Sequence, residues 1–153
     1  MKKNLCLLLV VTLAFTAGCG RLKGDDPVAK LKSHAVCLEK HLREEGSKDT
    51  DPKVIEDVSF DVRKTDSLTS PFVGTIQWVE KPKRLDSSFE FRMNLAYQEN
   101  QWILKEVQWR VDGEWEDYID KLARLFSMVK ETPSAELTNK GILRSWSEKL
   151  VCN

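Results

Sequence analysis

Apolar residues recur at spacings of three and four in the part of the chain that follows residue 25, which is typical of an amphipathic helix. The members of this stripe are Val28, Leu31, Ala35, Leu38 and Leu42. Asp26 and Pro27 make a favourable helix start, because aspartate caps the first amide groups and proline suits the first helical position. The pattern therefore predicts a helix over Val28–Glu45, followed by a polar loop.

Apolar and polar residues alternate along much of residues 58–111, which predicts about four antiparallel strands with one apolar and one charged face. The apolar phase contains Val58, Phe60, Val62, Ile76, Trp78, Phe89, Phe91, Met93, Leu95, Tyr97, Trp102 and Leu104. After Leu104 the apolar positions shift by one residue to Val107 and Trp109. A shift of this kind within a strand predicts a β-bulge near Lys105 and Glu106.

The spacing of apolar residues becomes helical again from Trp115, which predicts a second helix over Trp115–Lys130. A short last helix is expected to contain Ile142, Trp146 and Leu150. The predicted class is α+β, with an N-terminal helix, a curved antiparallel sheet of about four strands and C-terminal helices. All helices are expected to pack on the apolar sheet face, leaving the charged face in contact with water.

This order of elements resembles small cystatin-like and NTF2-like folds, in which a helix precedes and lies across a curved sheet. The stretches Ser70–Thr75 (SPFVGT) and Asn100–Lys105 (NQWILK) look like those of uncharacterised exported bacterial proteins with such sheets. The resemblance implies the architecture only and assigns no functional residues.

The N-terminus has the features of a secretory signal. Lys2 and Lys3 precede an apolar run, Leu5–Phe15, that is shorter than the ~20 residues of a transmembrane helix. The following Thr16-Ala17-Gly18-Cys19 resembles the bacterial lipobox, with threonine where that motif usually has leucine. The resemblance implies a signal peptide over residues 1–18 and a lipid on Cys19. The remaining residues, 19–153, are enough for one domain with one core, so a single domain is predicted. The absence of aspartate directly after Cys19 implies the outer membrane.

Two cysteines, Cys37 and Cys152, remain once the signal is removed and Cys19 carries lipid. An exported chain with two remaining thiols is expected to join them in a disulfide. The alternative is a zinc site made of Cys37, Cys152, His34 and His41, because the first helix would place three of these residues on one side.

Charge and motifs exclude some function classes. The chain of 153 residues has 24 basic and 24 acidic residues, so losing Lys2 and Lys3 leaves the mature protein slightly acidic. This balance argues against nucleic acid as a partner, because duplex binding usually needs a basic surplus. No nucleophile-elbow or phosphate-loop motif occurs in the sequence, so no catalytic residue and no cofactor are predicted.

Five tryptophans suggest both a core and an interface. Trp78, Trp102 and Trp109 fall on the apolar strand phase, whereas Trp115 and Trp146 are candidates for an interface. The opposite sheet face carries Asp61, Arg63, Glu90, Arg92, Lys105 and Arg110.

These features predict a membrane-anchored, non-catalytic lipoprotein that serves as a binding or accessory module of the cell envelope. Its polar sheet face is expected to contact an envelope protein or polymer. The alternative is a small NTF2-like enzyme or ligand carrier. A deep apolar cavity that holds a histidine or paired carboxylates would favour that alternative, and a filled core with a flat charged face would favour the binding module.

Overall fold

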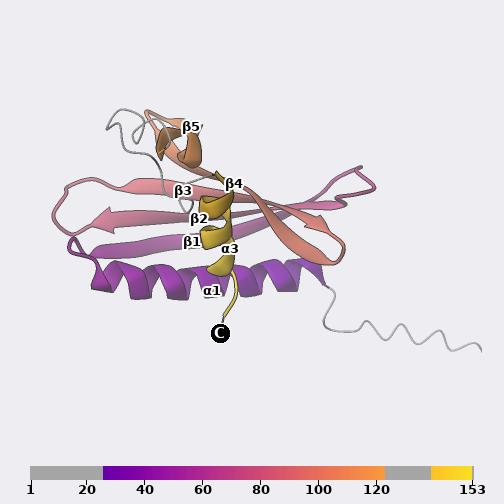
Figure 1. The fold of residues 1–153 in the computed structure, drawn as a ribbon, viewed down its shortest axis with the longest axis horizontal. Coiled ribbons are helices and arrows are strands. Elements are labelled where there is room, and N and C mark those ends of the chain that lie inside the picture. Colours follow the sequence, from indigo (N-terminus) through magenta and orange to yellow (C-terminus); the bar gives the residue numbers. More distant parts are fainter. Residues whose placement is uncertain (1–25, 123–138, 153) are drawn as a thin grey trace, which may run out of the picture.

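The computed structural model describes residues 26–122 and 139–152, which form an α+β fold (Figure 1). The five strands lie side by side in the order in which they occur in the chain, and all neighbours are antiparallel. The predicted class is confirmed, with one strand more than expected. The elements are α1 (Pro27–Lys48), β1 (Lys53–Lys64), β2 (Phe72–Pro82), β3 (Phe89–Gln98), β4 (Gln101–Val111), β5 (Glu114–Asp117) and α3 (Asn139–Glu148).

Helix α1 begins as the sequence predicts and continues to Lys48, three residues beyond the predicted end. The Asp26 carboxylate accepts a hydrogen bond from the Val28 amide at 3.1 Å, and Pro27 occupies the first turn. The predicted apolar stripe faces the sheet, with Leu31 and Leu38 fully buried. In Figure 1 the helix runs along the sheet with β1 as its nearest strand.

The helix approaches the sheet closely at Gly74 on β2. A Cβ atom at this position would lie 2.8 Å from Leu31 Cδ2 and 2.9 Å from Trp102 Cζ3. Glycine is therefore needed because the helix and the Trp102 ring occupy the space of any larger side chain. The Trp102 indole also donates a hydrogen bond to the Pro27 carbonyl at 2.9 Å, which fixes the start of α1 against β4.

The predicted apolar sheet face forms the core. Ile76, Trp78, Met93 and Val107 are almost completely inaccessible to solvent. Phe60 is paired with Ile76 and lies on the same face, but it is 36% exposed on β1, which is an edge strand of the sheet. Among the described residues, no charged side chain is fully buried.

Two β-bulges shape the sheet, and one of them is predicted. Asn94 pairs with Glu106 and Leu95 with Leu104, so Lys105 is the extra residue of β4. The bulge expected near Lys105 and Glu106 is thus confirmed. The second bulge lies in β1.

In the β1 bulge, Glu56 pairs with Val79 and Ser59 with Gln77, so two residues oppose Trp78. Asp57 adopts a positive φ of 52° at this position. The extra residue brings Ile55, which is 2% exposed, onto the same face as the apolar residues that follow the bulge.

The helix predicted over Trp115–Lys130 is wrong in its first residues. Asp112 and Gly113, with φ of 51° and 87°, form a tight turn that reverses the chain, and Trp115 pairs with Arg110 in β5. Helical structure begins only at Tyr118, where the Asp117 carboxylate caps the amides of residues 119 and 120. This helix is described through residue 122, and the rest of the predicted span lies outside the described residues.

The short last helix is confirmed as α3, which crosses the sheet in front of β1–β4 in Figure 1. Ile142 and Leu150 are buried, and the Trp146 ring lies 5.6 Å from the Trp78 ring between centroids. The helix therefore packs on the same apolar sheet face as α1, as the sequence predicts.

Candidate functional site

A disulfide joins the C-terminus to the middle of α1. Cys37 and Cys152 are bonded through their sulfur atoms, with their Cα atoms 5.1 Å apart. Cys37 is buried on α1, whereas Cys152 follows α3 and is exposed. The pairing is the one that the sequence predicts.

The two histidines hold the same C-terminal segment by hydrogen bonds. His34 Nδ1 lies 2.7 Å from the Leu150 carbonyl oxygen, and His41 Nε2 lies 3.1 Å from that of Val151. A carbonyl oxygen only accepts, so each of these ring nitrogens must carry the proton.

The four residues of the alternative metal site therefore meet in space but form no ligand set. Their sulfur atoms are bonded to each other, and one nitrogen of each ring donates to the backbone. In the part of the chain that the structure describes, no group of three His, Cys, Asp or Glu residues is arranged to hold a metal.

The candidate site is a cleft of about 340 Å³ between the end of α1, the apolar sheet face and α3. We call it the aromatic cleft. Its lining consists of Leu42, Glu45, Lys53, Glu80, Pro82, Phe89, Phe91, Trp109, Tyr118, Trp146 and Lys149. The volume lies within the range of small-molecule sites, which starts near ~300 Å³.

Aromatic rings make up much of the cleft wall, and the Tyr118 ring contacts three of the others. The Tyr118 ring lies 5.7 Å from Phe91, 6.0 Å from Trp109 and 6.4 Å from Trp146, measured between centroids. It is steeply inclined to all three, at 81°, 69° and 83°. Edge-to-face contacts of this type are favourable, so the rings hold each other in fixed orientations.

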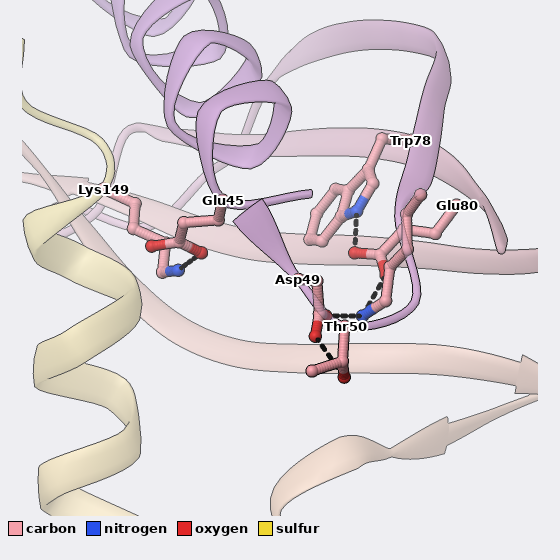
Figure 2. A network of polar contacts seen from close by, with 7 residues as sticks. Glu45, Asp49, Thr50, Trp78, Glu80 and Lys149 are labelled. Atoms are coloured by element: carbon pink, nitrogen blue, oxygen red, sulfur yellow. Dashed lines mark hydrogen bonds and ion pairs between the residues drawn. The ribbon is translucent and has the colours of Figure 1, made fainter. Parts of the chain in front are cut away.

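Charged residues line the cleft in two groups, which lie toward opposite sides of the view in Figure 2. On one side Lys149 of α3 contacts Glu45 of α1. On the other side Lys53 lies 3.6 Å from both Glu80 and Asp49. Glu80 also accepts a hydrogen bond of 3.1 Å from the Trp78 indole, which fixes the position of its carboxylate.

Burial affects two polar groups of the cleft-lining residues, the Tyr118 hydroxyl and the Trp109 indole nitrogen. Burial, reinforced by the negative charge of Glu80, raises the pKa of the Tyr118 hydroxyl, while Lys53 acts in the opposite direction. The indole Nε1 of Trp109 is buried and has no hydrogen-bond partner among the residues that the structure describes. A buried donor without a partner is costly to the folded state.

The opposite sheet face, here called the open face, holds a network of polar side chains. Asn94 donates to Glu106 at 2.9 Å and to Gln108 at 3.1 Å, and Gln108 accepts a further bond from Arg92. The Arg92 guanidinium lies over the Trp115 ring at 4.3 Å. Partial burial there lowers the pKa of Arg92, an effect that Glu106 opposes.

The charged residues that the sequence assigns to the open face lie there. Arg110 and Glu90 form an ion pair at 3.0 Å, and Arg63 and Asp61 form another at 2.8 Å. The central polar groups of this face bind one another, which leaves fewer of them free for a partner.

Two of the three tryptophans that the sequence assigns to the core are buried there. Trp78 and Trp102 are buried in the core, and Trp115 lies on the open face. Trp109 is only partly buried because it lines the cleft, and Trp146 lines it from α3.

Sequence reasoning missed the cleft, although one signal was present. Glu80 follows Ile76 and Trp78 at the same alternating spacing, so a carboxylate occupies the apolar phase of β2. Lys149 and Tyr118 gave no such signal, because their roles depend on elements that meet only in the folded chain.

Cys19, the predicted lipid attachment site, lies outside the described residues. None of the helices described is long and apolar enough to cross a membrane. Comparison with protein-family models, with characterised proteins and with solved structures finds no match for this chain.

Proposed function

We propose that the protein is a membrane-anchored, non-catalytic binding module of the bacterial cell envelope, and that its binding site is the aromatic cleft. The anchor is supported by the sequence alone, through the basic start, the apolar run and the lipobox-like Thr16–Cys19. The outer membrane is part of the same proposal and rests on the residue that follows Cys19.

The binding function is proposed because of the aromatic cleft. Ligand sites are concave and largely apolar, with a few polar groups that fix orientation. The aromatic cleft has this composition: rings around Tyr118 and charges at Glu80 and Lys149.

The open face has a weaker claim as the site. Arg92, Asn94 and Gln108 already hydrogen-bond within the face, so a partner would have to compete with these bonds. The cleft therefore favours the ligand-binding alternative from the sequence over contact with a polymer through the open face. It gives less support to an enzyme, because Glu45 and Glu80 are each paired with a lysine.

An uncharged aromatic probe tests the location of the site. We expect 1-naphthol to bind the full mature chain in a nonionic detergent with a sugar headgroup, and to change tryptophan fluorescence. Trp146→Leu should weaken this binding about tenfold, because it removes one aromatic wall of the cleft. Trp115→Leu on the open face is the matched control and should bind as the parent protein does.

Circular dichroism and thermal melting must show that both variants are folded. Absence of probe binding to the parent protein would refute the cleft as the binding site. So would a loss of binding in Trp115→Leu with none in Trp146→Leu.

A further inference from the structure

We infer that the ligand of the aromatic cleft is a zwitterion, in which an ammonium and a carboxylate or phosphate lie close together. This inference rests on the proposed function, because it assigns a ligand class to the same site. It is carried by the charges of the rim and by the cations that already lie on the cleft's rings.

The rim carries both signs in equal number. Two lysines and two glutamates line the cleft, and each glutamate is paired with a lysine. The best shielded members belong to different pairs: the side chain of Glu80 is 12% exposed and that of Lys149 is 18% exposed. A carboxylate and an ammonium are thus held in partly shielded positions within two separate ion pairs of the cleft lining, which lie apart from each other in Figure 2.

A ligand with one charge would fit this rim poorly. A cation alone would satisfy Glu80 but would crowd Lys53 and Lys149, and an anion alone would crowd the glutamates. Either ligand would add a net charge to a partly shielded rim whose charges already balance, which is unfavourable. A zwitterion brings one charge of each sign, so every charge of the rim keeps an opposite neighbour.

The aromatic wall already binds ammonium groups of the chain itself. Lys121 Nζ lies 5.3 Å from the centre of the Trp109 ring, and Lys149 Nζ lies 5.2 Å from that of Trp146. Tryptophan attracts cations more strongly than the other aromatic residues, and aromatic walls of this kind are used to recognise quaternary ammonium groups. The ligand's ammonium is therefore assigned to the part of the aromatic wall that contains Tyr118, near Glu80, and its anionic group is assigned to Lys149.

The ion pair at Glu80 is arranged so that a ligand can enter it. Lys53 lies 3.6 Å from the Glu80 carboxylate, which is too long for a hydrogen bond. The Trp78 indole binds the same carboxylate independently and keeps it in place. A ligand ammonium can thus approach Glu80 without displacing a hydrogen bond, while Lys53 retains Asp49 as a partner.

Titration calorimetry with soluble probes tests the ligand class. The full mature chain, in the same sugar-headed detergent, is titrated with phosphocholine, phosphoethanolamine, choline and inorganic phosphate. At least one of the two zwitterions should bind about tenfold more tightly than choline and phosphate. Equal or tighter binding of choline or phosphate would overturn the inference.

Two rim variants show whether the assigned charges act. Glu80→Gln keeps an acceptor for the Trp78 indole, and Lys149→Met keeps most of the side-chain length. Each should weaken zwitterion binding about tenfold, a larger loss than the same variant causes in the binding of uncharged 1-naphthol. Arg63→Met is the matched control, because its side chain is 80% exposed on the open face. Unchanged zwitterion affinity in both rim variants would refute the assignment.

The same chemistry could come from a lipid headgroup or from a free solute, and vesicles distinguish the two. Tighter binding to phosphatidylethanolamine vesicles than to soluble phosphoethanolamine, with the same loss in Glu80→Gln, would identify the headgroup. Tighter binding of the soluble probe would identify a free zwitterion. If 1-naphthol binds and no zwitterion does, the inference fails while the proposed function stands; if neither binds, the proposed function fails.

Discussion

Removal of the Cys37–Cys152 disulfide should destabilise the protein strongly and should open the aromatic cleft. The perturbation is the double variant Cys37→Ala/Cys152→Ala, or reduction of the parent protein. The bond connects residues that are 115 positions apart. The closed loop contains most of the described residues, so the bond restricts their conformations in the unfolded state.

The loss follows from the length of that closed loop. The chain-entropy relation gives about 5 kcal/mol for a separation of 115 residues. Small domains have a total free energy of unfolding of roughly 5–15 kcal/mol, so the bond is a large part of the stability. Without it, the C-terminal segment is held by the hydrogen bonds of His34 and His41 to backbone carbonyls and by the burial of Leu150.

We expect α3 to be the first element released. It supplies Trp146 and Lys149 to the cleft, so probe binding should fall before the sheet unfolds. Urea denaturation should therefore show a lower midpoint for the reduced protein and the double variant, with tryptophan emission as the readout. Binding of 1-naphthol should decrease at urea concentrations that leave the sheet signal in circular dichroism intact.

Mass spectrometry supplies the control for the bond itself. The non-reduced protein should be lighter than the reduced form by two protons per bond, and neither cysteine should react with an alkylating reagent before reduction. Free alkylation of both thiols in the native protein would disprove the pairing. Equal urea midpoints for the oxidised and reduced forms would refute the stability argument.

Three further predictions concern other parts of the chain. Gly74→Ala should cost roughly 1–3 kcal/mol of stability in urea denaturation, because its Cβ would meet Leu31 and Trp102 at under 3 Å; an unchanged midpoint would contradict the close approach of α1. Glu99→Asn should raise stability by up to about 1 kcal/mol, since Glu99 adopts a φ of 48° that asparagine tolerates better; a lower midpoint would count against this turn geometry. Cys19→Ser should abolish metabolic labelling with a fatty acid, and equal labelling of both proteins would exclude lipid on Cys19.

The main elements of the fold follow from local patterns. The helical spacing that starts at Val28, together with the Asp26 cap, is sufficient to define α1. The change in apolar parity after Leu104 locates the bulge at Lys105. These features are encoded by neighbouring residues, so the sequence alone reveals them.

The errors arise where two local signals compete. Trp115, Ile119 and Leu122 have helical spacing, but the Asp112-Gly113 turn reverses the chain and pairs Trp115 with β4. The bulge at Asp57 could have been inferred, because Ile55 and Val58 belong to different alternating phases. The aromatic cleft could be anticipated only at Glu80, since its other charged residues come from separate elements that tertiary packing brings together.

If Cys19 carries a lipid, the position of the cleft along α1 determines how far from the membrane the cleft can lie. Helix α1 has 22 residues and is about 33 Å long, and the cleft contacts it at Leu42 and Glu45, near its C-terminal end. The seven residue steps from Cys19 to Asp26 can span at most about 25 Å. With a lipid on Cys19, the cleft could reach headgroup level when α1 lies flat, and could stand roughly 50 Å above the bilayer when α1 is upright. One anchored chain could thus sample both the surface of its own leaflet and the solution beyond it.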